Sequence, residues 1–323
     1  HLTLNQTLLI LPVVGFKFIH LPIFIIYLST IGYFTLIAFS QKSKKEELFF
    51  SILCILVLLV KFNRLSEFGY DYVSQFILLI VFHKIYFLYF DNAEIIKSIL
   101  YFLLCVLIKP ISLLFSPILL YIIYKKGFIV LKQIPLSKYL LFFVLILTIV
   151  SSSFIKTGCI FYPLNKTCFE ENKVFWSEKT RLKKYSEIVK LWSKSYDAQN
   201  ESKYEKIKDK ELYNKNFNWV KFWIEKHFFY KIFEFLLIII SLIFLILLYF
   251  SRSKSSQNND YKDKIVIFCL SILSILFWFN TVPQFRFGFS SILIFIFFLF
   301  NLPFNFNINF NKKNLFIFLF LEY

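Results

Sequence analysis

Long apolar runs, separated by short charged loops, dominate the chain. A helix needs about 20 apolar residues to cross a bilayer, and several runs reach or approach that length. These runs cover residues 18–40, 48–61, 73–90, 98–124, 138–155, 230–250, 265–280 and 289–302, and another begins at 314–321. The pattern predicts an all-α, polytopic membrane protein.

The run 98–124 carries Lys109 and Pro110 at its middle. Proline removes a helical hydrogen bond, and a charge is unfavourable at the centre of a bilayer. We therefore predict two short helices, at 98–108 and 111–124, which meet at the membrane surface. With this break, the chain is expected to have about 9–10 membrane helices.

Lys and Arg are distributed unevenly over the loops between these runs. Thirteen fall in the loops 41–47, 91–97, 125–137, 251–264 and 303–313, whereas four fall in 61–72, 109–110 and 281–288. Cytoplasmic loops carry the excess of basic residues, so the first set is expected on the cytoplasmic side. The second set and the long segment after Ser151 are then expected on the outer face.

The long polar segment, residues 157–229, divides the membrane helices into 1–156 and 230–323. Residues 170–231 carry 15 Lys and Arg against 10 Asp and Glu, so this stretch is expected in water. Leu182, Tyr185, Ile188 and Trp192 recur at helical spacing, which predicts amphipathic helices. We expect a helical cap on the periplasmic face.

The composition of the chain favours a membrane protein over a soluble or nucleic-acid-binding protein. The 58% hydrophobic content exceeds that of soluble domains, and the net charge of +17 comes from lysines in short loops. This distribution argues against a nucleic-acid partner and favours anionic membrane lipids. The chain has no glycine-rich phosphate loop, no nucleophile elbow and no His/Cys cluster for a metal, and it identifies no cofactor. Because the printed chain begins with His1 and contains no Met, we expect that residues precede it.

One outer loop holds Arg64, Glu67 and Asp71 at helical spacing. Paired carboxylates there suit a general base or an acceptor of sugar hydroxyls, which makes Glu67 and Asp71 catalytic candidates. The alternative is a solvated loop in which Glu67 pairs with Arg64.

A second outer loop holds Gln284 and Arg286, with Phe285 and Phe287 beside the arginine. A lone guanidinium among aromatic residues suits a phosphate or pyrophosphate. The alternative is an interfacial arginine that reaches lipid headgroups. Within the run 73–90, His83 and Lys84 are interpreted as the cytoplasmic end of a short helix, with Asp91 and Glu94 near enough to pair with Lys84.

The start of the polar segment holds Cys159 and Cys168, nine residues apart across Pro163. In an oxidising periplasm they can form a disulfide, and the alternative is two unpaired thiols. Tyr162 and Trp176 are candidates for stacking against a sugar ring.

Three short stretches together resemble a group of bacterial polytopic membrane proteins similar to the C-type glycosyltransferase superfamily. They are SEFGYD at 66–71, TGCIFYP with the following TC at 157–168, and PQFRFG at 283–288. The resemblance implies a polytopic helical membrane domain that uses a polyprenyl-phosphate-linked sugar on the periplasmic face. That superfamily's catalytic Asp lies in the first outward loop, and this chain has no acidic residue before Glu46. Either that loop precedes His1 or this chain lacks the glycosyltransferase activity.

The resulting hypothesis is a multi-pass glycosyltransferase-like protein of the bacterial inner membrane, acting in cell-envelope polysaccharide or glycolipid assembly. Arg286 would bind the lipid-linked phosphate, with Gln284 and Arg64 beside it, while Glu67 and Asp71 contact the sugar or acceptor. The alternative is a non-catalytic polysaccharide or lipid transporter, or a polymerase-like membrane component.

Overall fold

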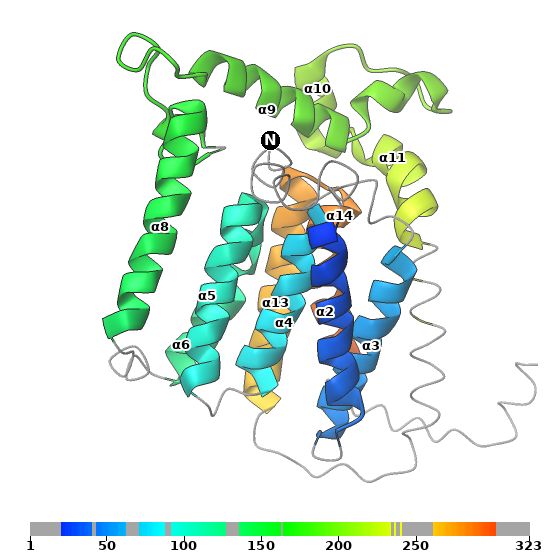
Figure 1. Ribbon diagram of the computed structural model, residues 1–323. Helices are drawn as coiled ribbons and strands as arrows, with labels where there is room; N and C mark the ends of the chain where they lie inside the picture. Colours follow the sequence, from blue (N-terminus) through cyan, green and yellow to red (C-terminus); the bar gives the residue numbers. More distant parts are fainter. Residues whose placement is uncertain are drawn as a thin grey trace, which may run out of the picture.

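The computed structural model describes residues 21–40, 43–62, 71–87, 92–126, 136–162, 164–233, 236, 240 and 261–301. Its regular elements over these ranges are helices, arranged as an upright bundle with a cap of shorter helices across one end (Figure 1). The all-α prediction is confirmed for this part of the chain. The predicted runs 230–250 and 314–321 lie wholly or mostly outside it.

The bundle is organised around α4 (Asp71–Phe87), which has buried residues on all of its faces. Its neighbours include α2 (Leu21–Ala38), α3 (Lys45–Lys61), α5 (Asn92–Ile108) and α14 (Phe285–Asn301). The core between them is mainly aromatic and aliphatic, and a few polar contacts cross it. Gln75 Oε1, for example, accepts a hydrogen bond from Ser290 Oγ at 2.6 Å.

The predicted break at Lys109 is confirmed. Helix α5 ends at Ile108, Lys109 is extended, and the 3₁₀ helix η3 (Pro110–Phe115) begins at the proline and leads into α6 (Ser116–Lys126). Proline is tolerated there because the first N–H of a helix has no intrahelical partner. Ser274 of α13 (Tyr261–Thr281) donates to the Leu114 carbonyl at 2.8 Å, which ties η3 to that helix.

Helix α8 (Leu136–Thr157) stands at the side of the bundle, next to α5 (Figure 1). Its apolar side chains are exposed on all sides, among them Leu140, Phe143 and Leu147. In the described part of the chain, two helical segments are long and apolar enough to cross a membrane, Tyr139–Thr157 and Lys262–Thr281. Shorter apolar helices cover Ile23–Ala38, Pro110–Lys125 and Phe285–Asn301.

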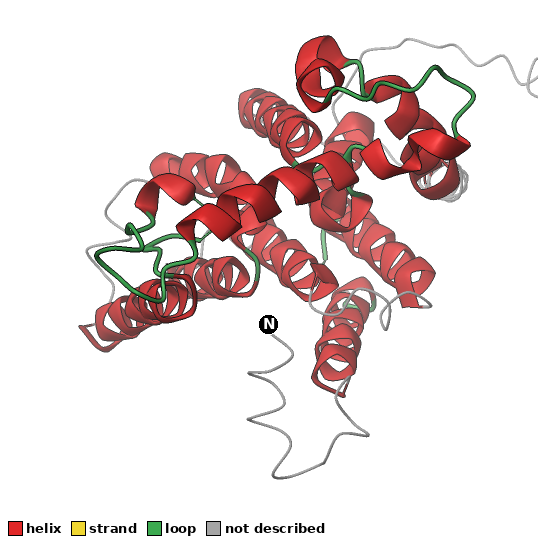
Figure 2. Ribbon diagram, turned by 90° about the horizontal axis from the view of Figure 1, so that it is seen from above, coloured by secondary structure: helices red, strands yellow, loops and turns green. Residues whose placement is uncertain are grey.

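The cap, residues 157–229, begins where α8 ends. A disulfide joins Cys159 to Cys168 around the short η4 (Asn165–Thr167). Helix α9 (Lys179–Ser193) then crosses the end of the bundle, roughly perpendicular to the helices below it (Figure 2). The remaining elements are η5 (Tyr196–Glu201), α10 (Lys210–Asn214), η6 (Lys215–Phe217), α11 (Val220–Trp223) and the π-helical η7 (Ile224–Phe233).

Candidate functional site

Three charged side chains from distant parts of the chain meet at the capped end of the bundle. Asp71 Oδ1 pairs with Lys109 Nζ, and Asp71 Oδ2 lies 3.1 Å from Arg286 Nε. We call Asp71, Lys109 and Arg286 the charged triad. Asp71 is buried, whereas the Arg286 and Lys109 side chains keep 16% and 31% of their surface exposed. The triad is therefore reached from the side of Lys109.

Helix ends bring the triad together. Asp71 is the first residue of α4, Lys109 precedes η3, and Arg286 lies in the first turn of α14. A carboxylate at a helix N-terminus complements the positive end of the helix dipole. The N-termini of α4 and α14 thus place amide N–H groups and partial positive charge beside two full cations.

The cap covers this end through Trp192, near the end of α9. The Arg286 guanidinium lies 5.4 Å from the Trp192 ring centroid and 4.8 Å from that of Phe287. Cations favour such positions over aromatic faces, more so when partly desolvated. Arg286 is thus held by one carboxylate and two rings, with one ring supplied by the cap.

Two tryptophans fix the turn that carries Arg286. Trp223 of α11 donates from Nε1 to the Pro283 carbonyl at 2.6 Å, and Trp278 of α13 donates to the Gln284 carbonyl at 2.8 Å. Gly288 packs so closely against Trp278 that a Cβ there would lie 2.7 Å from the indole. The position of Arg286 therefore depends on both the cap and α13.

Charge sets the chemistry of this end. Among the residues that the structure describes, the side chains of Lys109 and Arg286 both pair with the Asp71 carboxylate, next to two helix N-termini. Such an arrangement binds anions, because cations and oriented amides act together. Over the described residues there is no group of three or more His, Cys, Asp or Glu side chains that could hold a metal.

The structure brings together two of the residues selected from the sequence, Asp71 and Arg286. Lys109, which the sequence indicated only as a helix break, is the third member, and Trp192 is the cap residue that touches Arg286. A charged residue before a proline inside an apolar run was the available signal for Lys109. Gln284 is buried and its backbone carbonyl holds Trp278.

Tyr162 and Trp176 lie elsewhere in the cap. Trp176 Nε1 donates to the Phe154 carbonyl at 3.2 Å, and Tyr162 N donates to Ser153 Oγ at 2.8 Å, so both lie at the end of α8. That end adjoins the start of α9, about 20 Å from Trp192 at 1.5 Å per residue. The two residues therefore lie apart from Trp192 and Arg286, and their stacking against a sugar ring stays a prediction. Arg64 and Glu67 lie outside the described residues.

Over the described residues, these features define an all-helical bundle that is capped at one end over a cluster of one carboxylate and two basic side chains. The chain belongs to the family described as domain of unknown function DUF8201, whose model matches residues 4–293. No curated protein and no solved structure matches the chain.

Proposed function

We propose that this chain is a multi-pass protein of the bacterial inner membrane that binds a polyprenyl-phosphate-linked sugar. In this proposal it transfers the glycosyl group during assembly of cell-envelope polysaccharide or glycolipid, like the C-type glycosyltransferases that it resembles. The charged triad under Trp192 is the observation that carries the proposal. Lys109 and Arg286 hold the phosphate, and Asp71 faces the sugar or acceptor hydroxyl.

The outer surface of the bundle supports the membrane assignment. Large apolar side chains are exposed between its two charged ends, for example Leu28 on α2, Leu120 on α6 and Phe277 on α13. Contiguous exposed apolar surface of this kind is unfavourable in water and favourable in lipid. Only two of the described helices have the full length of a membrane span, and several apolar helices are shorter. In this proposal the shorter helices also lie in the membrane and end where the chain reaches the surface at a short loop, as at Lys109.

The disulfide supports the orientation. Disulfides persist in the periplasm and are rare in the cytosol, so the Cys159–Cys168 bond supports a cap on the periplasmic side. The triad lies under the same cap. In this proposal the lipid-linked phosphate lies at the capped end of the bundle, the end that α9 crosses (Figure 1).

The proposed chemistry follows from the charges. The phosphate oxygens take the place of Asp71 on Arg286 and Lys109, which frees the Asp71 carboxylate to accept a hydrogen bond from the acceptor hydroxyl. The acceptor oxygen then forms a bond to the anomeric carbon and passes its proton to the Asp71 carboxylate, while the bond from that carbon to the phosphate oxygen breaks. The lipid phosphate leaves with the electron pair, and the two cations stabilise its negative charge.

The first test is binding of polyprenyl phosphate to the protein in nanodiscs of zwitterionic lipid. Arg286→Ala and Lys109→Ala are each expected to weaken binding by about 10- to 100-fold, because a hydrogen bond to a charged group contributes about 1.5–3 kcal/mol. Arg181→Ala is the matched control, since that guanidinium is exposed on α9 and pairs only locally with Glu178. Equal affinities in all four proteins would overturn the assignment.

The variant Asp71→Asn distinguishes a phosphate-binding site from a cluster of ion pairs that only stabilises the fold. If Asp71 competes with the phosphate for the two cations, the amide is expected to tighten binding several-fold while transfer of the sugar falls. If the triad only fixes the helix ends, Asp71→Asn lowers stability and leaves phosphate binding absent, as in the parent. Movement of the lipid-linked sugar across the bilayer without a new glycosidic bond would favour the transporter alternative.

A further inference from the structure

A short hairpin follows the last turn of α8. The N–H of Phe169 donates to the Gly158 carbonyl at 3.0 Å where its two arms meet α8. The disulfide between Cys159 and Cys168, both of which are buried, joins the arms one residue further along. We call residues 158–169 the disulfide hairpin. Because these bonds hold its arms together, the hairpin presents its other side chains in a fixed arrangement.

The disulfide hairpin lies beside the last turns of α8. Tyr162 N donates to Ser153 Oγ at 2.8 Å. Trp176, in the turn after the hairpin, donates from Nε1 to the Phe154 carbonyl at 3.2 Å, and the two rings pack edge to face at 5.6 Å. Both α8 residues belong to the candidate membrane span Tyr139–Thr157. The hairpin therefore lies at the level at which this span would leave a bilayer.

Large apolar side chains of the hairpin and of the turn after it are exposed. Phe161 is 48% exposed, Leu164 is 59% exposed, and Phe175 is 89% exposed. Exposed aromatic and leucine side chains are typical of segments that lie in the interface between lipid and water. Their place next to the end of a span indicates that lipid covers them.

The charges of this region fit the same partner. Lys156 at the end of α8 and Lys166 in η4 are exposed. Glu170 and Glu171, which follow the hairpin, contact the first turn of α9 instead. Lysine side chains beside apolar residues extend their ammonium groups toward the headgroups of lipids. The hairpin thus combines apolar side chains for the acyl chains with cations for the phosphates.

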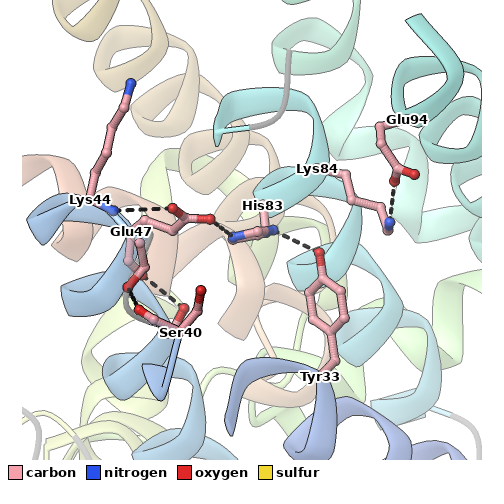
Figure 3. Close-up of polar contacts among 9 residues, drawn as sticks. Tyr33, Ser40, Lys44, Glu47, His83, Lys84 and Glu94 are labelled. Atoms are coloured by element: carbon pink, nitrogen blue, oxygen red, sulfur yellow. Dashed lines mark hydrogen bonds and ion pairs between the residues drawn. The ribbon is translucent and has the colours of Figure 1, made fainter. Parts of the chain in front are cut away.

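The opposite end of the bundle is held by contacts between side chains (Figure 3). His83 Nε2 of α4 lies 2.9 Å from Glu47 Oε1 of α3. Lys84 of α4 pairs with Glu94 of α5, as the sequence suggested, whereas Asp91 lies outside the described residues. Helix α8 contacts the bundle mainly through α5, and its exposed sides leave the hairpin open to lipid.

We propose that the disulfide hairpin and the turn after it anchor the cap to the lipid surface. Phe161, Leu164 and Phe175 insert between lipids of the outer leaflet, and Lys156 and Lys166 bind headgroup phosphates. The anchor fixes the start of α9, the helix that crosses the end of the bundle above the charged triad. Because the anchor rests on the membrane assignment in the proposed function, its test must distinguish a failed anchor from a failed assignment.

The test measures the depth of single nitroxide labels on the full-length protein in phospholipid liposomes. The labels are attached at Phe175→Cys or Leu164→Cys, which replace exposed side chains. Cys269→Ser removes the exposed free thiol, while Cys54 and Cys105 are buried. Collisions with oxygen, which concentrates among the acyl chains, are compared with collisions with a water-soluble nickel chelate.

Two further labels give the reference values, Leu147→Cys near the middle of α8 and Glu205→Cys on the exposed surface of the cap. The oxygen-to-nickel ratio at Phe175→Cys and Leu164→Cys is expected to exceed that at Glu205→Cys by about threefold or more. Hairpin ratios equal to that at Glu205→Cys, with a high ratio at Leu147→Cys, would overturn the anchor and leave water or a partner protein around these side chains. An aqueous ratio at Leu147→Cys would overturn the membrane assignment as well.

Charge reversal tests the two lysines. Lys156→Glu combined with Lys166→Glu is expected to lower the oxygen-to-nickel ratio at Phe175→Cys by about twofold, because carboxylates are repelled by headgroup phosphates. Lys206→Glu combined with Lys208→Glu is the matched control, since both lysines are exposed in the cap outside the hairpin. An equal change in both double variants, or no change in the first, would contradict phosphate binding by Lys156 and Lys166.

Discussion

Lys194 is a buried cation of the cap whose ammonium contacts an amide oxygen and an aromatic ring. It is 4% exposed, its ammonium donates to Asn214 Oδ1 at 3.2 Å, and it lies 4.6 Å from the Trp219 ring centroid. An amide oxygen and a ring face stabilise an ammonium less than water does. Burial, with Lys190 as a second cause, therefore lowers the pKa of Lys194 from 10.5 to about 8.

This shift predicts that the cap becomes more stable as the pH rises above 8. The folded lysine releases its proton near pH 8 and the unfolded lysine near 10.5, so between these values the unfolded state binds more protons. The free energy of unfolding then increases with pH, by at most about 1.4 kcal/mol per pH unit. Below pH 8 the cost of burying the charge is fully present. Denaturant unfolding followed by tryptophan fluorescence at several pH values measures the slope.

The control for this prediction is Lys194→Met, which keeps the length of the side chain and removes the charge. Other lysines and tyrosines also change charge at high pH. The effect of Lys194 is therefore read from the difference in the free energy of unfolding between the variant and the parent at each pH. The variant is expected to be more stable than the parent at pH 7, and the gap should close toward pH 10. A gap that is independent of pH would show that Lys194 is not desolvated in the folded cap.

At the scale of single residues, the sequence located the charged triad only in part. Arg286 was recognisable because it is the only basic residue between Lys264 and Lys312. Asp71 was recognisable from its place in an outer loop. Their pairing with Lys109 joins positions that are far apart in the chain, and only the packing of α4, η3 and α14 creates it. The placement of Tyr162 and Trp176 away from Arg286 has the same origin, because the length of α9 separates them from it.

The junction between α8 and the cap depends on one glycine. Gly158 has φ of +68°, and a Cβ there would lie 2.7 Å from Ser177 Cα. Its N–H donates to the Phe154 carbonyl, and its own carbonyl accepts from Phe169 N, so it closes α8 and opens the disulfide hairpin. A side chain at this position meets both a strained backbone and a neighbouring backbone atom.

Gly158→Ala is therefore expected to destabilise the junction by about 1–3 kcal/mol. The measurement is the rate of limited proteolysis between α8 and α9 in the full-length protein, which should rise by an order of magnitude or more. Gly32→Ala is the matched control, because nothing lies within 4 Å of a Cβ there and Ala is favoured within α2. Faster cleavage in Gly32→Ala, or unchanged cleavage in Gly158→Ala, would contradict this account.

At the scale of elements, the apolar runs and the proline predicted the bundle helices well. The break at Pro110 is local chemistry, so it was visible in the sequence. The starts of the helices were placed less well: α3 and α5 begin three and six residues before the predicted runs, at Lys45 and Asn92. Their first turns contain charged residues, which hydropathy assigns to loops. The π-helical η7 was not predicted, because its wider turns follow from tertiary packing rather than from a distinct residue pattern.

At the scale of the whole molecule, the two ends of the bundle carry separate sets of polar contacts. The capped end holds the charged triad. The other end holds Glu46 with Lys264 at 2.6 Å, Asp263 with Lys125 at 2.7 Å, and Lys84 with Glu94. The first two pairs join the loops 41–47 and 125–137 to the loop 251–264, and the third joins α4 to the loop 91–97. These loops were grouped by alternation across the predicted spans and by their basic residues. The loops predicted to share the cytoplasmic side therefore lie at the same end of the bundle. This agreement requires that the run 98–124 be counted as two helices, with a break at Lys109.

This arrangement predicts which residues an impermeant reagent reaches in intact cells. Arg181 lies exposed on α9, and Lys97 lies exposed at the opposite end of the bundle. In spheroplasts, Arg181→Cys is expected to react with a membrane-impermeant maleimide, and Lys97→Cys only after the membrane is permeabilised. The native Cys159 and Cys168 should become reactive from outside only after reduction, since they form a disulfide. Labelling of both engineered positions from outside would mean that the bundle does not separate its ends across a membrane. Labelling of Lys97→Cys alone would invert the orientation and place the charged triad in the cytoplasm, where a periplasmic lipid-linked sugar does not reach it.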